Sequence, residues 1–158
     1  MEVVGRDPEL QAIARWLEGA PEDVLVIEGD PGLGKTTLWR AALDEADRRA
    51  FLTLRSSPAQ SEAQLSFAAL RDLLDQPFDE IAGELPEPQR RALAVTLLRE
   101  PPRDEPPDRG TVAATLLSVL RALGARKPTL VAVDDLQWLD SASYDPLRYA
   151  IRRLEPGS

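Results

Sequence analysis

The stretch at residues 29–37, GDPGLGKTT, constrains the fold of this chain more than any other part of its sequence. It combines three glycines with one of only two lysines in the chain. Small residues let the backbone curl so that successive N–H groups point inward at phosphate oxygens. A helix that begins at the end of such a loop adds its free N–H groups and the positive end of its dipole. The stretch therefore predicts a phosphate-binding loop between a strand and a helix.

The spacing of the loop matches the P-loop pattern G-x-x-x-x-G-K-[ST], formed by Gly29, Gly34, Lys35 and Thr36. Lys35 is predicted to reach the β- and γ-phosphates of a nucleotide, and Thr36 to place its hydroxyl on Mg²⁺. The alternative is a glycine-rich turn that binds nothing, which the flanking apolar run and helical pattern disfavour. The predicted cofactor-binding residues of the loop are Gly29, Asp30, Pro31, Gly32, Leu33, Gly34, Lys35, Thr36 and Thr37.

A second candidate site is the pair Asp134 and Asp135, which follows the apolar run TLVAV at residues 129–133. Open α/β sheets bind ligands beyond the carboxyl ends of their strands, and a P-loop enzyme needs a carboxylate there to hold Mg²⁺. Asp134 is predicted to contact Mg²⁺ through water. Asp135 is predicted to polarise the attacking water, as a catalytic residue together with Lys35. The alternative is a solvated Asp-Asp turn; the sheet edge shared with the loop favours the metal site.

Apolar runs alternate with helical patterns along the chain and predict an α/β fold, a three-layer αβα P-loop NTPase with a parallel sheet. Strands are predicted at residues 23–28, 51–55 and 129–133, the first of them a buried parallel strand. Residues 99–109 predict a proline-rich loop, and Asp108 is expected to cap the helix that follows. Helices are predicted at residues 7–18, 35–48, 65–74, 88–98, 108–123 and 141–154.

Composition excludes several classes of function. The chain has no cysteine and no histidine, so disulfides, thiol chemistry, histidine-ligated metals and Ser-His-Asp triads are excluded. The net charge of -8 disfavours direct binding of nucleic acid, which needs clustered Lys and Arg. No apolar run approaches the roughly 20 residues of a membrane span, and the N-terminus has no signal-peptide pattern. A cytoplasmic location without membrane contact is expected.

Four strings in this sequence resemble one protein family: VVGRDPEL, GDPGLGKTTL, SFAALRDLL and VAVDDLQWLD. They are similar to the STAND/AAA-type P-loop ATPase domain of large LuxR-family (LAL, MalT-like) bacterial transcriptional regulators. The resemblance implies an ATP-driven switch that works with Mg²⁺ and prefers ATP to GTP, with self-association or regulatory proteins as further partners. It also implies that Val4, Gly5 and Arg6 lie against the adenine or ribose, although Arg6 could equally be a surface residue. It further implies that Trp138 and Asp140, which follow the Mg²⁺ carboxylate, help to arrange the site; for Trp138 the alternative is simple packing.

The resemblance further implies that the chain is the N-terminal part of such a domain. Family members continue to a fourth strand with a polar or basic sensor residue, a fifth strand and a helical lid. The fourth strand lies between the phosphate-loop strand and the Mg²⁺-carboxylate strand, so we expect a gap at the sheet centre or an exposed apolar edge. We expect ATP binding but not efficient hydrolysis. Two other interpretations stay open: another P-loop NTPase or small-molecule kinase, and a non-catalytic interaction fragment.

Overall fold

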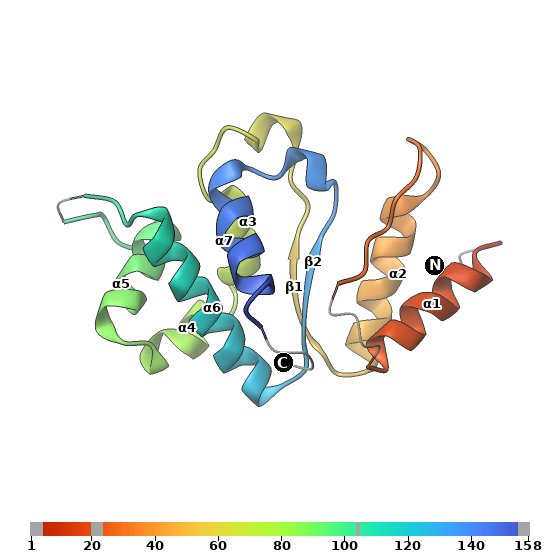
Figure 1. Cartoon of the computed structure of the whole chain (residues 1–158), viewed down its shortest axis with the longest axis horizontal. Coiled ribbons are helices and arrows are strands. Elements are labelled where there is room, and N and C mark those ends of the chain that lie inside the picture. The colour runs from red at the N-terminus through yellow and green to blue at the C-terminus, as the bar shows by residue number, and fades with distance from the viewer. Residues whose placement is uncertain (1–4, 20–23, 104, 155–158) are drawn as a thin grey trace.

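Among the described residues two parallel strands form a sheet, and helices cover both of its faces (Figure 1). The computed structural model describes residues 5–19, 24–103 and 105–154. Strand β1 (Leu52–Ser56) pairs with β2 (Thr129–Val133) in a register that places Leu54 beside Val131. The ladder continues past β2, because the N–H of Asp134 donates to the carbonyl of Ser56 over 3.0 Å. The predicted α/β class with a parallel sheet and helices on both sides is therefore confirmed.

Most of the predicted helices are present, with shifted ends. The helix predicted at residues 65–74 begins only at Ala68, so residues 65–67 are not part of it, and the short helix α4 was not predicted. The described residues between 99 and 108 form no helix or strand, as the prolines predict. No helix among the described residues is long and apolar enough to cross a membrane. The helices are α1 (Asp7–Leu17), α2 (Lys35–Arg48), α3 (Ala68–Leu74), α4 (Phe78–Ile81), α5 (Glu87–Thr96), α6 (Arg109–Arg126) and α7 (Ser141–Ile151).

Each face of the sheet has its own hydrophobic core, because successive side chains of a strand point to opposite faces. Leu54 of β1 packs with residues of α3 to α7 on one face. Leu130 and Ala132 of β2 pack with α1 and α2 on the other face. The sheet thus separates the helix pair that contains the phosphate loop from the larger helical layer.

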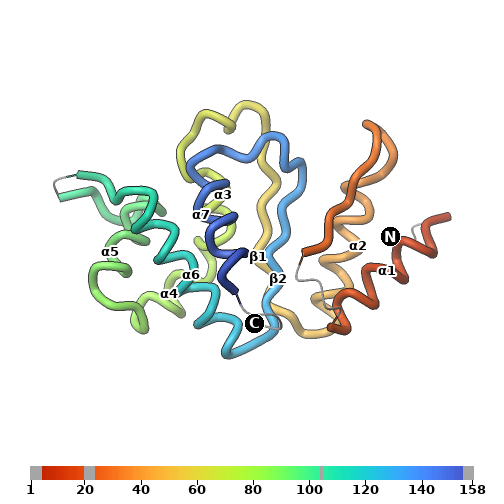
Figure 2. The backbone as a smooth tube through the Cα atoms, in the orientation of Figure 1, coloured from red at the N-terminus to blue at the C-terminus, as the bar shows by residue number. Residues whose placement is uncertain are grey.

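The prediction of a buried strand at residues 23–28 is wrong for the part that the structure describes. Residue 23 lies outside the described residues, and residues 24–28 form no strand and pair with neither β1 nor β2. Val26 is 62% exposed, and only Ile27 of this segment packs against the core beside α1 and α2. Figure 2 shows the segment outside the two-stranded sheet. An apolar run is buried only where a neighbouring strand covers it, and the described residues supply none here.

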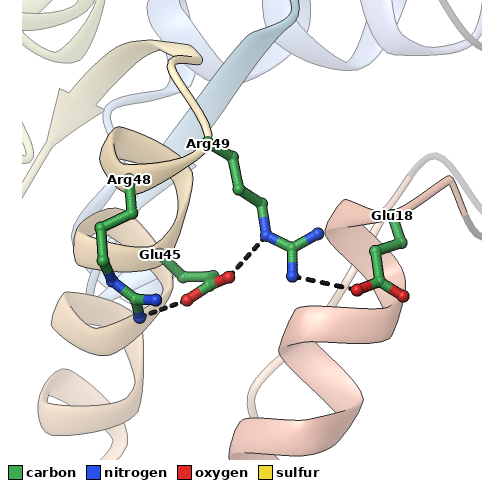
Figure 3. Close-up of polar contacts among 4 residues, drawn as sticks. All are labelled: Glu18, Glu45, Arg48 and Arg49. Carbon is green, nitrogen blue, oxygen red and sulfur yellow. Dashed lines mark hydrogen bonds and ion pairs between the residues drawn. The ribbon is translucent and has the colours of Figure 1, made fainter.

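Helices α1 and α2 run side by side in the same direction, held at their C-terminal ends by an ion-pair network (Figure 3). Arg49 donates to Glu18 after α1 over 3.1 Å and to Glu45 of α2 over 2.5 Å. Arg48 also pairs with Glu45. The hydrogen bond from the Arg49 guanidinium holds the pKa of the Glu45 carboxyl below its ordinary value. The N-terminal ends are linked as well, because Arg6 before α1 donates to the carbonyl of Leu33 before α2.

Asp108 caps helix α6, as predicted. Its Oδ1 accepts hydrogen bonds from the N–H groups of Gly110 and Thr111, and its Oδ2 accepts one from the Thr111 hydroxyl. These bonds, with the Thr111 hydroxyl as the largest contribution, hold the pKa of the Asp108 carboxyl below its ordinary value of 3.8. A lowered pKa in the folded state stabilises the protein above the ordinary value, and the gain is lost as the pH falls through the lowered pKa.

Asp108→Asn is therefore expected to lower the free energy of unfolding at neutral pH, because the amide accepts these hydrogen bonds less well than the carboxylate does. The difference in the free energy of unfolding between the variant and the unchanged protein should shrink as the pH falls from about 4 toward 2. At low pH the Asp108 carboxyl is protonated and is as neutral as the Asn amide. Urea unfolding at several pH values measures it. Glu105→Gln, at an exposed position in the preceding loop, controls for the loss of one negative charge. A difference that stays constant down to pH 2 would contradict this prediction.

Candidate functional site

The loop at residues 29–34 leads directly into helix α2, whose N-terminal end is left open. Gly34 is the N-cap residue in a left-handed conformation, no side chain caps the helix and its first turn contains no acidic residue. The first hydrogen bond of the helix runs from the N–H of Leu38 to the carbonyl of Gly34 over 3.1 Å. The N–H groups of residues 35–37 therefore have no acceptor within the helix. This arrangement attracts an anion.

Lys35 turns its side chain back over the loop that precedes it. The Nζ atom donates to the carbonyl oxygens of Gly29 and Asp30 over 2.9 and 3.0 Å. The Nζ group is thus held by two neutral acceptors beside the open end of α2. The loop residues 29–34 are all exposed, while the side chains of Thr36 and Thr37 are half-buried. A ligand can therefore approach the loop from solvent.

Arg6, the N-cap residue of helix α1, contacts the same loop. Its Nη2 donates to the carbonyl of Leu33 over 2.7 Å, and its Nη1 donates to Oε1 of Glu9 over 2.7 Å. The hydrogen bond from Arg6 lowers the pKa of the Glu9 carboxyl. Gly5 lies just before Arg6 in a left-handed conformation, and the predicted contact residue Val4 lies outside the described residues. Arg6 is half-buried and has a defined partner on the loop, unlike a free surface arginine.

A pocket of about 260 Å³ lies between α1, residues 25–28 and the start of α2. Its wall includes Arg6, Leu33 and Lys35, so it adjoins the loop. The remaining wall is mostly apolar, with Ala12 and Ile13 from α1. A pocket with an apolar wall and a few polar groups at one end is the usual form of a small-molecule site.

The predicted metal residue Asp134 lies just beyond strand β2 and is buried. Its Oδ1 accepts a hydrogen bond from the N–H of Asp135 over 3.0 Å. Asp135 has a left-handed backbone, with φ of 48°, and its exposed carboxylate accepts a hydrogen bond from Gln137 over 2.9 Å. A left-handed conformation is uncommon outside glycine but is tolerated by Asp. The two neighbouring carboxylates therefore differ: one is enclosed at the strand end and the other faces solvent.

The loop and the acidic pair lie at the same end of the molecule, at the top of Figure 1. Among the described residues, no hydrogen bond or ion pair joins Asp134 or Asp135 to Lys35 or Thr36. The described residues also contain no group of three or more acidic, histidine or cysteine side chains that could enclose a metal. One hydroxyl and one carboxylate are enough for Mg²⁺, which keeps several waters and takes phosphate oxygens as ligands. The donor set present therefore fits Mg²⁺ bound together with a phosphate ligand.

Asp140 joins the acidic turn to helix α3. Its Oδ1 accepts from the N–H groups of Phe67 and Ser143 over 2.9 Å each, and its Oδ2 accepts from Ala69 over 3.2 Å. It thus caps the start of α7 and the start of α3 at once, and only 3% of it is exposed. Trp138 is half-buried in the short turn between the acidic pair and Asp140. Both segments that Asp140 joins contributed to the family resemblance.

Sequence reasoning missed two contacts at this site. Glu9 orients Arg6, and the spacing of three residues on a helix is a signal that could have indicated the pair. The bond from Arg6 to the Leu33 carbonyl joins residues 27 positions apart and has no such signal, because a backbone carbonyl is present at every residue.

The comparison with protein families gives one match. The family model described as the AAA ATPase domain matches residues 2–158, which is nearly the whole chain. No curated protein and no solved structure matches the chain.

Proposed function

Because the chain belongs to the AAA ATPase domain family, whose members bind nucleotides, we propose that it binds Mg-ATP as a regulatory switch module and hydrolyses it slowly. The observation that carries this proposal is the open N-terminus of α2 behind the loop at residues 29–34. Free N–H groups, a helix dipole and the ammonium of Lys35 meet there without an acidic neighbour in the first turn. This combination suits a polyphosphate better than any other common ligand.

In this proposal each loop residue has a role that its position allows. Lys35 exchanges its bonds to the Gly29 and Asp30 carbonyls for bonds to phosphate oxygens, which are charged and therefore stronger acceptors. The N–H groups of residues 35–37 bind the phosphate nearest to the helix. Arg6 borders the loop through its bond to the Leu33 carbonyl. The exposed backbone of residues 29–34 completes the cradle.

Thr36 and Asp134 would hold Mg²⁺, which neutralises charge on the phosphates. The burial of Asp134 favours a strong interaction with a cation, because little water competes for the carboxylate. Asp135, whose carboxylate is exposed, is the proposed residue that polarises the attacking water. Hydrolysis is proposed to be slow, since no arginine of the described residues contacts the loop apart from Arg6.

A role in a STAND-type module of LuxR-family-like regulators is the finer part of the proposal. It rests on the strings SFAALRDLL and DDLQWLD. The Asp140 carboxylate at the end of the second string accepts hydrogen bonds from the N–H groups of Phe67 and Ala69 in the first. A change in the acidic turn on nucleotide binding would act directly on the start of α3 through these bonds. In such a module the output goes to regulatory proteins or to further copies of the chain.

Thr36→Ala tests the proposed use of Mg²⁺. Mg²⁺ should tighten ATP binding in the unchanged protein. In Thr36→Ala this gain in affinity should be about tenfold smaller, because a metal ligand is lost. ATP affinity in EDTA should change little, because the backbone cradle remains. Isothermal titration calorimetry with ATP, in Mg²⁺ and in EDTA, measures both values.

Thr36→Ser is the matched control, because serine keeps the hydroxyl and should keep the effect of Mg²⁺. If the unchanged protein binds ATP in neither condition, the proposed function is wrong. If both variants respond to Mg²⁺ equally, ATP binding stands but Thr36 is not a metal ligand. Transfer of phosphate to a small acceptor would instead favour a kinase.

A further inference from the structure

The carbonyl of Leu33 is the part of the phosphate loop that another segment of the protein holds. Arg6 donates to it over 2.7 Å from a position 27 residues earlier in the chain. The Leu33 side chain is 51% exposed, so side-chain packing does little to place this residue. The N–H of Leu33 makes only a long bond of 3.3 Å to the carbonyl of Asp30. The orientation of Leu33 therefore depends mainly on Arg6.

Without Arg6, the peptide between Leu33 and Gly34 would be free to rotate. Gly32 and Gly34 flank Leu33 with φ angles of 82° and 77°, and glycine has access to many other conformations at little cost. The peptide unit itself is planar and trans, so the carbonyl of Leu33 and the N–H of Gly34 point in opposite directions. A bond that holds the carbonyl toward Arg6 therefore turns the N–H of Gly34 away from Arg6.

Glu9 holds the other side of the Arg6 guanidinium, over 2.7 Å. The two bonds use different nitrogens, Nη1 for Glu9 and Nη2 for Leu33, so the planar group bridges helix α1 and the loop. The ion-pair network at the other end of α1 and α2 fixes the two helices against each other. The anchor for Arg6 is therefore a helix that is itself attached to α2.

We propose that Arg6 and Glu9 form a clamp that sets the peptide plane of Leu33 and Gly34 and so presents the Gly34 N–H to a phosphate group. This inference rests on the proposed function, and it assigns Arg6 as a positioning residue for the polyphosphate. It differs from the contact with adenine or ribose that the family resemblance implies, because the guanidinium acts through the loop backbone. The clamp is complete without nucleotide, so the loop is arranged before the ligand arrives.

The experiment compares ATP with inorganic tripolyphosphate, which has the phosphates without the nucleoside. We expect Arg6→Ala to weaken binding of both by the same factor, about tenfold, as for the loss of a hydrogen bond from a charged group. Arg15→Ala, an exposed arginine on the same helix, should leave both affinities within about twofold. Glu9→Ala should also weaken the binding of both ATP and tripolyphosphate. A loss for ATP alone, or no loss, would overturn the clamp.

A second measurement on the nucleotide-free protein separates the clamp from the proposed function. The NMR order parameter of the Gly34 amide should fall in Arg6→Ala, from about 0.85 to below about 0.6, and stay unchanged in Arg15→Ala. An unchanged order parameter in Arg6→Ala would overturn the clamp even if the protein binds ATP. If the protein binds no ATP, the proposed function fails while this measurement still decides whether Arg6 orders the loop.

Discussion

Asp140→Ala is expected to lower the free energy of unfolding by about 3–5 kcal/mol. The substitution leaves the N–H groups of Phe67 and Ala69 without their acceptor, at a residue that is only 3% exposed. The N–H of Ser143 loses the carboxylate but keeps its bond to the carbonyl of residue 140 over 3.1 Å. Each buried donor without a partner costs about 1–3 kcal/mol, and two helices lose a cap together. Phe67 also has a left-handed backbone, with φ of 62°, and its bond to Asp140 helps to hold that unfavourable conformation. Urea unfolding followed by circular dichroism measures the loss.

Two further variants locate the origin of this effect. Asp140→Asn keeps the Oδ1 acceptor for Phe67 and Ser143 and loses only the bond from Ala69, so it should be clearly less destabilising. Asp145 is an exposed residue of helix α7, and its carboxylate pairs with Arg109. Asp145→Ala should lower the free energy of unfolding by less than about 0.5 kcal/mol. Equal losses for Asp140→Ala and Asp145→Ala would contradict the role of Asp140 as a double cap.

Lys35→Ala is expected to weaken ATP binding by about 100-fold, which corresponds to about 2.7 kcal/mol. The ammonium is the only cation in the first turn of α2 and can bind two phosphate groups at once. The variant also loses the bonds to the Gly29 and Asp30 carbonyls, which are exposed and can bind water instead. The melting temperature without nucleotide should therefore change little. Calorimetric titration with ATP and Mg²⁺ measures the affinity.

The only other lysine of the chain provides the matched control. Lys127 is exposed after helix α6, and Lys127→Ala removes the same charge far from the loop in sequence. ATP affinity should stay within about twofold in this variant. If Lys35→Ala binds ATP as tightly as Lys127→Ala, then the loop does not hold the phosphates, and the proposed function has to be abandoned.

Local chemistry allowed the helices and the two paired strands to be predicted. Helical periodicity, the Asp108 cap and the prolines at residues 101–107 act over a few positions and leave a signal in the sequence. The short helix α4 was missed, and so was the start of α3 at Ala68, three residues later than predicted. At Phe67 the decisive contact is Asp140, 73 residues later, which no local pattern contains.

For the candidate site, too, the short-range features were predicted and the long-range contacts were not. The spacing of Gly29, Gly34, Lys35 and Thr36 predicted a loop before a helix, because phosphate-loop chemistry requires those residue types next to one another. The apolar run at residues 23–28 predicted a buried strand, which is wrong for the described residues 24–28, because a strand forms only where a neighbouring strand pairs with the run.

The sequence by itself determined the fold class and the glycine-rich loop before α2, since both follow from short-range patterns of residue type. Only the tertiary structure decided that Arg6 holds the Leu33 carbonyl and that Asp140 joins two helices. These contacts use backbone groups that every residue carries, so their partners are selected by packing. The parallel arrangement of α1 and α2, and the position of α3 beside α7, bring those partners within hydrogen-bond distance.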